Sequence, residues 1–170
     1  ALERPCLNVL QRMSGIATLT ADAVKKVEEA GSNVRIAGTR KTVLGVLDHK
    51  AIEIGGGLSH RIGLQDSFLI KRNYLVSGKI GIENAIKKIW LKRKLSRFLE
   101  IEVDDENRAV MAARTLRELY KGCKDDYPCI IMLDNLTPKG VKSSIKSIKR
   151  YIGSNNIIIE ISGGINPDNL

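Results

Sequence analysis

Apolar residues recur at helical spacing through the first thirty positions, and a glycine follows soon after the last of them. They are Leu7, Leu10, Ile16, Leu19, Val24 and Val27. This periodicity predicts one long helix, and the Ala30-Gly31 pair is a suitable place for that helix to end. Beyond it we expect a strand over residues 34–37, a short helix over about 45–54, a glycine turn, and a strand over residues 68–71.

From residue 82 the chain alternates regularly between helical faces and short apolar runs. Three helices are predicted by the groups Ile82, Ile86 and Ile89; Ala109, Ala112, Leu116 and Leu119; and Val141, Ile145 and Ile148. Strands are expected over residues 98–103, 129–133 and 157–161. Nearly continuous apolar strands are typical of a sheet that is covered on both faces, and β-α-β alternation implies parallel pairing.

This alternation is compatible with an α/β barrel or with a doubly wound sheet. We favour the barrel because polar residues follow the predicted strands, and barrel enzymes build their sites at that rim. These residues are Lys71, Glu102 with Asp104, Asp134, and Ser162-Gly163-Gly164. The strands are too few to close an eight-stranded barrel. We therefore expect an incomplete, open TIM-like α/β barrel over residues 32–170, preceded by a long helix in a linking region, residues 1–31.

The charge and the cysteines narrow the possible partners and the compartment. Lys and Arg number 28 against 19 for Asp and Glu, and the net charge of +9 attracts phosphates, carboxylates, nucleic acid or anionic lipid. No apolar run approaches the roughly 18 to 20 residues that a membrane helix needs. The three cysteines, Cys6, Cys123 and Cys129, show neither CxxC nor Cys/His spacing, which argues against a disulfide framework or a zinc site. We expect a cytoplasmic protein without a membrane partner.

Several cations stand where a parallel sheet would bring them to one rim. Arg40 and Lys41 follow a predicted strand, His60 and Arg61 follow three glycines, and Lys71 ends a strand. Arginine recognises carboxylate or phosphate with two parallel hydrogen bonds, and lysine adds a mobile point charge. Such a cluster suits a small polyanion. Ordinary salt bridges from Arg40 and Arg61 to Asp48 or Asp66 are the alternative for either residue alone.

Acidic residues and a glycine pair could complete such a site. In "EIEVDD" the strand alternation puts Glu100, Glu102 and Asp104 on one side, and with Asp134 they could hold Mg²⁺ or sugar hydroxyls. The "ISGGI" turn after the last predicted strand could present backbone N–H groups to a phosphate. A simpler interpretation is that the acidic residues are solvated at the end of a strand and that the glycine pair forms an ordinary turn.

A nucleic-acid-binding domain is the main alternative from another functional class. The stretch "KKIWLKRKLSR" carries six basic residues in eleven and includes Trp90. The helical face of Ile82, Ile86 and Ile89 argues against it, because that face would be buried and would leave Lys87, Lys88, Lys92 and Arg93 as a solvated outer surface.

The ordered motifs together resemble the quinolinate phosphoribosyltransferase family, the carboxylating nicotinate-nucleotide pyrophosphorylases. The resemblance runs through "ERPCLNVLQRMSGIAT", "TRKT", "AIEIGGGLSHRIGLQDSFLIKRN", "EIEVDD", "IMLDN" and "EISGGI". It implies a two-domain transferase, of which most of an amino-terminal α/β sandwich and the end of the barrel lie outside this chain. Such enzymes join quinolinate to phosphoribosyl pyrophosphate and release pyrophosphate and carbon dioxide, which leaves nicotinate mononucleotide for NAD biosynthesis.

The resemblance also implies roles for individual residues. Arg40, His60, Arg61 and Lys71 match quinolinate-binding positions, with Thr39 and Lys41 in the same loop. Arg4 matches an arginine that the neighbouring subunit of a homodimer or larger homo-oligomer supplies. Glu102 and Asp134 match residues that hold the phosphoribosyl group and its Mg²⁺, with Asp104 beside them. Ser162, Gly163 and Gly164 match the 5-phosphate site, and Lys71, Glu102 and Asp134 are the candidate catalytic residues.

Several positions depart from the usual family pattern. "IKRNY" has Arg72 and Tyr74 where the family usually has Asp and His, and "LSHR" has Ser59 where Asn is common. The segment that follows Lys41 reads "TVLG" and is about two residues short. These departures keep open a related phosphoribosyltransferase-like protein with another acceptor or without activity.

Overall fold

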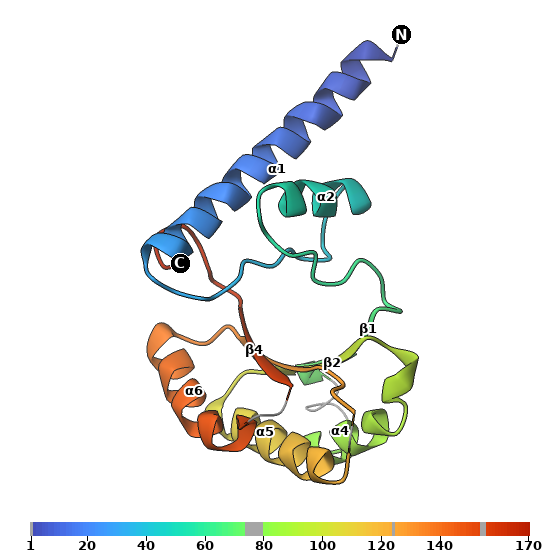
Figure 1. Cartoon of the computed structure of the whole chain (residues 1–170), viewed down its shortest axis with the longest axis vertical. Coiled ribbons are helices and arrows are strands. Elements are labelled where there is room, and N and C mark those ends of the chain that lie inside the picture. Colours follow the sequence, from blue (N-terminus) through green and yellow to red (C-terminus); the bar gives the residue numbers. More distant parts are fainter. Residues whose placement is uncertain (1, 74–79, 124, 154–155) are drawn as a thin grey trace. The chain divides into compact units, whose positions relative to one another are not determined.

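The computed structural model describes residues 2–73, 80–123, 125–153 and 156–170, and the chain forms two compact units (Figure 1). The first unit contains residues 1–64 and 165–170, and the second contains residues 65–164. Each unit is described by itself below. The predicted role of residues 1–31 as a link to a further domain stays a prediction.

Two helices dominate the first unit. The predicted long helix is confirmed as α1 (Glu3–Glu29), and the short one as α2 (Val46–Ile54). The glycines after α2 allow it to approach α1 closely, since a Cβ atom at Gly55 would lie 2.6 Å from Thr20 Cβ. No real Cβ atom fits at that distance. The glycine run therefore serves helix packing as well as the turn that was expected from the sequence.

The strand predicted over residues 34–37 is wrong. The segment makes a single parallel bridge, between Ala37 and Leu58, flanked by hydrogen bonds from Gly38 N to Leu58 O and from Leu58 N to Ile36 O, each 2.8 Å long. Val34 is 62% exposed. Because the apolar run lacks both a neighbouring strand along its length and a buried face, it remains an extended loop with one paired residue.

The second unit is a parallel four-stranded sheet with the strand order β1-β2-β3-β4. Its strands are β1 (Ser67–Ile70), β2 (Phe98–Val103), β3 (Cys129–Asp134) and β4 (Ile157–Ser162). Its helices are α4 (Ile82–Trp90), the short 3₁₀ helix η1 (Arg93–Leu95), α5 (Glu106–Lys121) and α6 (Pro138–Ile152). All of the helices and strands predicted for this region are therefore confirmed, with boundaries shifted by a few residues.

Strand order and helix placement identify the sheet as part of a barrel. Consecutive strands are neighbours, and Figure 1 shows α4, α5 and α6 on the same side of the sheet. A doubly wound sheet would reverse its strand order and carry helices on both sides. On the two central strands, the helix-facing residues Leu99, Ile101, Val103, Ile131 and Leu133 are fully buried. The expected open α/β barrel is confirmed.

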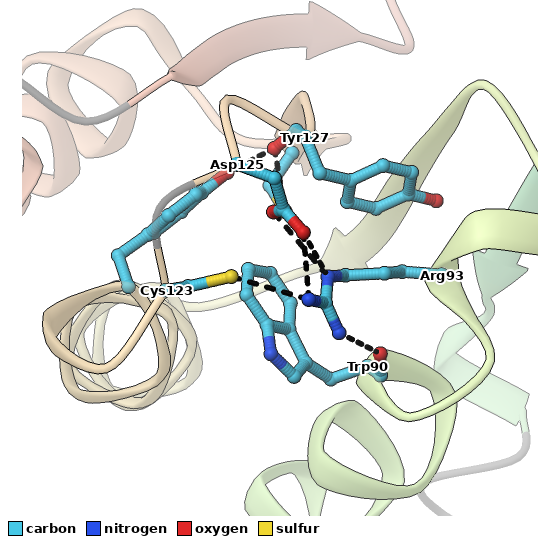
Figure 2. Close-up of polar contacts among 7 residues, drawn as sticks. Trp90, Arg93, Cys123, Asp125 and Tyr127 are labelled. Atoms are coloured by element: carbon cyan, nitrogen blue, oxygen red, sulfur yellow. Dashed lines mark hydrogen bonds and ion pairs between the residues drawn. The ribbon is translucent and has the colours of Figure 1, made fainter.

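Arg93 lies in a polar cluster rather than on the solvated surface expected for the basic stretch (Figure 2). Its Nη2 atom donates to Asp125 Oδ2 at 2.7 Å and to Cys123 Sγ at 3.2 Å, and its guanidinium stacks 4.8 Å from the Trp90 ring centre. Trp90 itself is 5% exposed. An aromatic side chain that is buried in the core cannot stack on nucleic-acid bases, so this stretch loses the feature that favoured nucleic-acid binding.

No helix in the described part of the chain is long and apolar enough to cross a membrane.

Candidate active site

The sheet face opposite the helices carries the polar residues. Side chains of paired residues in a parallel sheet point to the same face, and the register pairs Glu102 with Met132, Met132 with Glu160, and Asp134 with Ser162. Lys71 follows the end of β1, whose last residue pairs with Ile101. The predicted rim residues of this unit therefore gather at the carboxyl ends of the four strands: Lys71, Glu102, Asp104, Asp134, Ser162, Gly163 and Gly164.

Two further glutamates, Glu100 and Glu160, lie on the same face. Glu100 is fully buried, and its carboxylate lies within 4.8 Å of the carboxylate of Glu160 on β4. Glu100 was expected beside Glu102 from the strand alternation, whereas Glu160 was not among the predicted residues. The signal for Glu160 was the alternation of β4 together with a parallel register, which puts it in the same layer as Glu102.

Glu102 and Asp134 fit the proposed metal role in chemical type. Both are half-buried carboxylates at the ends of neighbouring strands, and carboxylate oxygens are ligands that Mg²⁺ prefers. Asn135 Nδ2 donates to Asp134 Oδ2 at 3.0 Å, which orients that carboxylate. These two residues could thus hold Mg²⁺ together with oxygen atoms of a substrate.

Asp104 has a different environment, because two arginines bind it. Its Oδ2 atom accepts from Arg72 Nη1 at 3.2 Å, and its Oδ1 atom accepts from Arg108 Nη1. Burial raises the pKa of Asp104, and the hydrogen bonds from Arg108 and Arg72 lower it by more, so that the pKa lies below its usual value. Asp104 therefore anchors arginines in this structure and is a poorer candidate for a metal ligand than Glu102 or Asp134.

The turn after β4 has a backbone that only glycine adopts easily. Gly163 and Gly164 have φ angles of +80° and +68°, a region that side chains disfavour. The turn is tied to β3 because Asn135 N donates to Ser162 O at 2.9 Å. A Cβ atom on Gly163 would lie 2.6 Å from Asn135 Cγ. The predicted phosphate turn thus packs directly against the residue that follows Asp134.

The cationic loops of the first unit lie side by side. The parallel bridge of Ala37 with Leu58 sets the "TRK" loop, residues 39–41, beside the "SHR" loop, residues 59–61, because both loops leave the bridge in the same direction. Thr39 Oγ1 accepts from Lys41 N at 3.2 Å and shapes the first loop. Arg40 and Lys41 are exposed, whereas His60 and Arg61 are half-buried. This unit therefore brings five of the predicted residues together.

A buried carboxylate holds the shortened segment after Lys41. Asp48 is 1% exposed and accepts from Arg12 Nε at 2.8 Å and Arg12 Nη2 at 2.7 Å. Its Oδ2 atom also accepts from the backbone N–H groups of Val43 and Leu44, each at 3.1 Å. Arg12 and these N–H groups lower the pKa of Asp48 to about 2. The sequence analysis considered Asp48 as a partner of Arg40 or Arg61, and the structure instead pairs it with Arg12.

Ser59 and Arg4 complete the picture of the first unit. Ser59, which stands where the family usually has Asn, donates to Glu53 Oε1 at 2.8 Å and so ties its loop to α2. Arg4 is exposed in the first turn of α1. Tyr74, the other position that departs from the pattern, lies outside the described residues.

The chain is similar to known proteins of one family. Residues 16–170 match the family described as "Quinolinate phosphoribosyl transferase, C-terminal domain". Two probable carboxylating nicotinate-nucleotide pyrophosphorylases are similar over 99% of the chain, one from Methanocaldococcus jannaschii at 40% identity and one from Methanothermobacter thermautotrophicus at 34%. The chain covers 56% and 57% of their respective lengths.

A solved structure has a similar fold. The crystal structure of NadC from Streptococcus pyogenes matches with a TM-score of 0.76 and 30% sequence identity. The match covers 97% of this chain and 52% of that one. The chain therefore spans a little over half the length of the relatives that it matches. From the family match, these identities and the shared fold, we conclude that the chain belongs to the quinolinate phosphoribosyl transferase family.

Proposed function

We propose that the protein to which this chain belongs transfers the phosphoribosyl group of phosphoribosyl pyrophosphate to quinolinate. The products are nicotinate mononucleotide, pyrophosphate and carbon dioxide, and the enzyme is a pentosyltransferase of NAD biosynthesis. The observation that carries the proposal is the rim of the sheet: the carboxyl ends of four adjacent strands carry Lys71, Glu102, Asp134 and the Ser162–Gly164 turn. Cationic, acidic and phosphate-binding elements are the parts that this reaction requires.

The first step is displacement at C1 of the ribose. The pyridine nitrogen of quinolinate forms a bond to C1 as the bond to pyrophosphate breaks, and positive charge develops on the ribose ring. Glu102 and Asp134 stabilise that charge and orient the ribose hydroxyls. Glu102 and Asp134 would also hold Mg²⁺, which would neutralise part of the charge on the departing pyrophosphate. Arg40, His60, Arg61 and Lys71 bind the two carboxylates of quinolinate and hold its nitrogen in line.

The second step is loss of the 2-carboxylate. After ribosylation the ring nitrogen is cationic, and it stabilises the electron pair that remains at C2 when carbon dioxide departs. A proton then adds to C2 from the Lys71 ammonium or from water. The chain's own residues need to provide only positioning, exclusion of water and that proton.

Release of labelled carbon dioxide tests the reaction directly. We expect the intact protein, given Mg²⁺, phosphoribosyl pyrophosphate and quinolinate labelled in its 2-carboxylate, to release one labelled carbon dioxide for each pyrophosphate.

Arg61→Ala should raise the KM for quinolinate about tenfold and leave the KM for phosphoribosyl pyrophosphate nearly unchanged, because one charge-assisted interaction is lost.

The matched control is Arg35→Ala, which removes an exposed arginine of the same unit outside the two loops. Its KM values should equal those of the wild type. Pyrophosphate release without carbon dioxide would mean that water is the acceptor or that ribosylated quinolinate keeps its 2-carboxylate, and either result would contradict the proposed reaction, as would release of neither product.

We also propose a homodimer or higher homo-oligomer in which Arg4 enters the partner's active site. Support comes from the exposed apolar side chains beside Arg4 on α1, namely Leu2, Leu7 and Leu10, which are 76%, 51% and 61% exposed. Mixing inactive Arg4→Ala subunits with inactive Lys71→Ala subunits should restore part of the activity, because one site of each mixed dimer is then complete. Absence of any recovery after the subunits are shown to exchange would contradict the shared site.

A cytoplasmic location is part of the same proposal. All three cysteines are free in the structure, as expected for a protein in a reducing compartment. The proposed reaction uses a soluble phosphorylated substrate, which fits this location.

A further inference from the structure

Arg72 occupies a position that the proposed reaction has not yet used. It follows Lys71 directly beyond β1, so that two cationic residues are consecutive in the chain at this end of the strand. The family usually has an acidic residue at this position. A reversal of charge beside a candidate catalytic lysine changes the kind of ligand that this part of the rim can bind.

Asp104 binds one edge of the Arg72 guanidinium. Arg72 Nη1 donates to Asp104 Oδ2 at 3.2 Å, and Asp104 is held in turn by Arg108 from the first turn of α5. Arg108 Nε also lies 3.4 Å from Oδ2 of Asp105, the residue that caps α5. Because a guanidinium has five N–H donors in a fixed plane, a carboxylate on one edge leaves the other edge able to bind a second anion. The Arg72 side chain is 51% exposed, so that edge is accessible.

The position of Arg72 in the sheet indicates which anion it would bind. β1 and β4 are the outer strands of this four-stranded order, and with a spacing of about 4.8 Å between strands they are roughly 14 Å apart. The glycine turn after β4 is the candidate 5-phosphate site, and Arg72 lies at the opposite edge. A phosphoribosyl donor carries a phosphate at one end and a diphosphate at the other, so it can extend along this rim.

We propose that Arg72, anchored by Asp104, provides an anion subsite for the diphosphate group of the phosphoribosyl donor, next in the chain to Lys71. This inference rests on the proposed function for the identity of the donor. The subsite would bind the diphosphate of the substrate and the pyrophosphate that leaves from it. Arg72 would thus stabilise the leaving group.

Binding of inorganic pyrophosphate tests the subsite without requiring turnover. We expect calorimetric titration of the intact protein to show pyrophosphate binding that is about tenfold weaker in Arg72→Ala, since one charge-assisted contact is lost. Arg72→Lys should give an intermediate affinity because it keeps the charge but loses the planar fork. Inorganic phosphate should discriminate less between the variants, because it can occupy the glycine turn alone.

The matched control is Arg114→Ala. Arg114 has a similar exposure, 58%, and an ion pair with Glu83 at 2.8 Å, but it lies on α5 away from the strand ends. Its pyrophosphate affinity should remain within about twofold of the wild type. Equal affinities of Arg72→Ala and the wild type, or an equal loss in Arg114→Ala, would overturn the subsite.

The outcome separates this inference from the proposed reaction. Arg72-dependent pyrophosphate binding in a protein that releases no carbon dioxide from quinolinate would support the subsite and reject the acceptor. Carbon dioxide release that Arg72→Ala leaves unchanged, together with unchanged pyrophosphate binding, would support the reaction and reject the subsite. Thermal melting of each variant checks that folding is intact, and loss of the exposed ion pair should change the melting temperature little.

Discussion

Replacing Gly163 by alanine is expected to lower both the stability and the activity of the protein. The added Cβ atom would lie 2.6 Å from Asn135 Cγ and 2.9 Å from Asn135 N, and the φ angle of +80° is unfavourable for alanine. Relief of the clash must move the turn or Asn135, whose N–H group bonds Ser162 O. We expect a loss of about 3 kcal/mol in the free energy of unfolding and, because the phosphate turn is displaced, a fall of about a hundredfold in kcat/KM.

Gly164→Ala separates the two causes. Gly164 also has a positive φ, +68°, but no atom lies within 4 Å of the Cβ position that the substitution would fill. It should therefore lose only the conformational part, about 1 kcal/mol, as measured by denaturant unfolding. If Gly163→Ala has the same free energy of unfolding and the same kcat/KM as Gly164→Ala, the close approach of Gly163 to Asn135 contributes to neither stability nor activity.

The elements of the fold were predictable because each one leaves a local signal. The spacing of Ile82, Ile86 and Ile89 predicted α4, and the unbroken apolar run at the centre of β3 predicted a strand covered on both faces. Residues 34–37 gave a similar apolar signal without becoming a strand. The difference is that this segment has no neighbouring strand along its length, since only Ala37 is bridged. A pairing partner that is distant in sequence cannot be recognised from the local pattern.

The rim of the sheet was predictable for a topological reason. Parallel strands end on the same side, so polar residues after each strand had to gather once the alternation was recognised. The ion pairs were not predictable in the same way. Asp48 binds Arg12 across 36 positions, and Arg93 binds Asp125 across 32. Each choice among several available partners depends on side-chain geometry that the sequence pattern does not contain.

The cationic loops show how such a pair can support a site. Asp48 accepts hydrogen bonds from Val43 N and Leu44 N, which follow Arg40 and Lys41 by only a few residues. The shorter segment after Lys41 is therefore held by one buried carboxylate, which is in turn fixed to α1 by Arg12. The conformation of the segment next to the "TRK" loop therefore depends on an acid that is itself buried.

Asp48→Asn should accordingly be among the most destabilising substitutions in the first unit. Both carboxylate oxygens accept hydrogen bonds, one from Arg12 Nε and the other from Arg12 Nη2, Val43 N and Leu44 N. An amide has one oxygen, so its NH₂ group must face at least one of these donors. We expect a loss of about 3 kcal/mol in the free energy of unfolding at pH 7, measured by denaturant unfolding followed by circular dichroism.

The same substitution should change the response to acid. Because the pKa of Asp48 falls from 3.8 to about 2 on folding, its charge stabilises the folded state above about pH 4 and ceases to do so as the pH falls toward 2. The stability difference between the wild type and Asp48→Asn should therefore shrink between pH 5 and pH 2.

Glu29→Gln, which removes an exposed partner of Lys25, is the control and should change stability by less than about 0.5 kcal/mol. A difference between the wild type and Asp48→Asn that stays constant down to pH 2 would show that the charge of Asp48 contributes nothing to holding this loop.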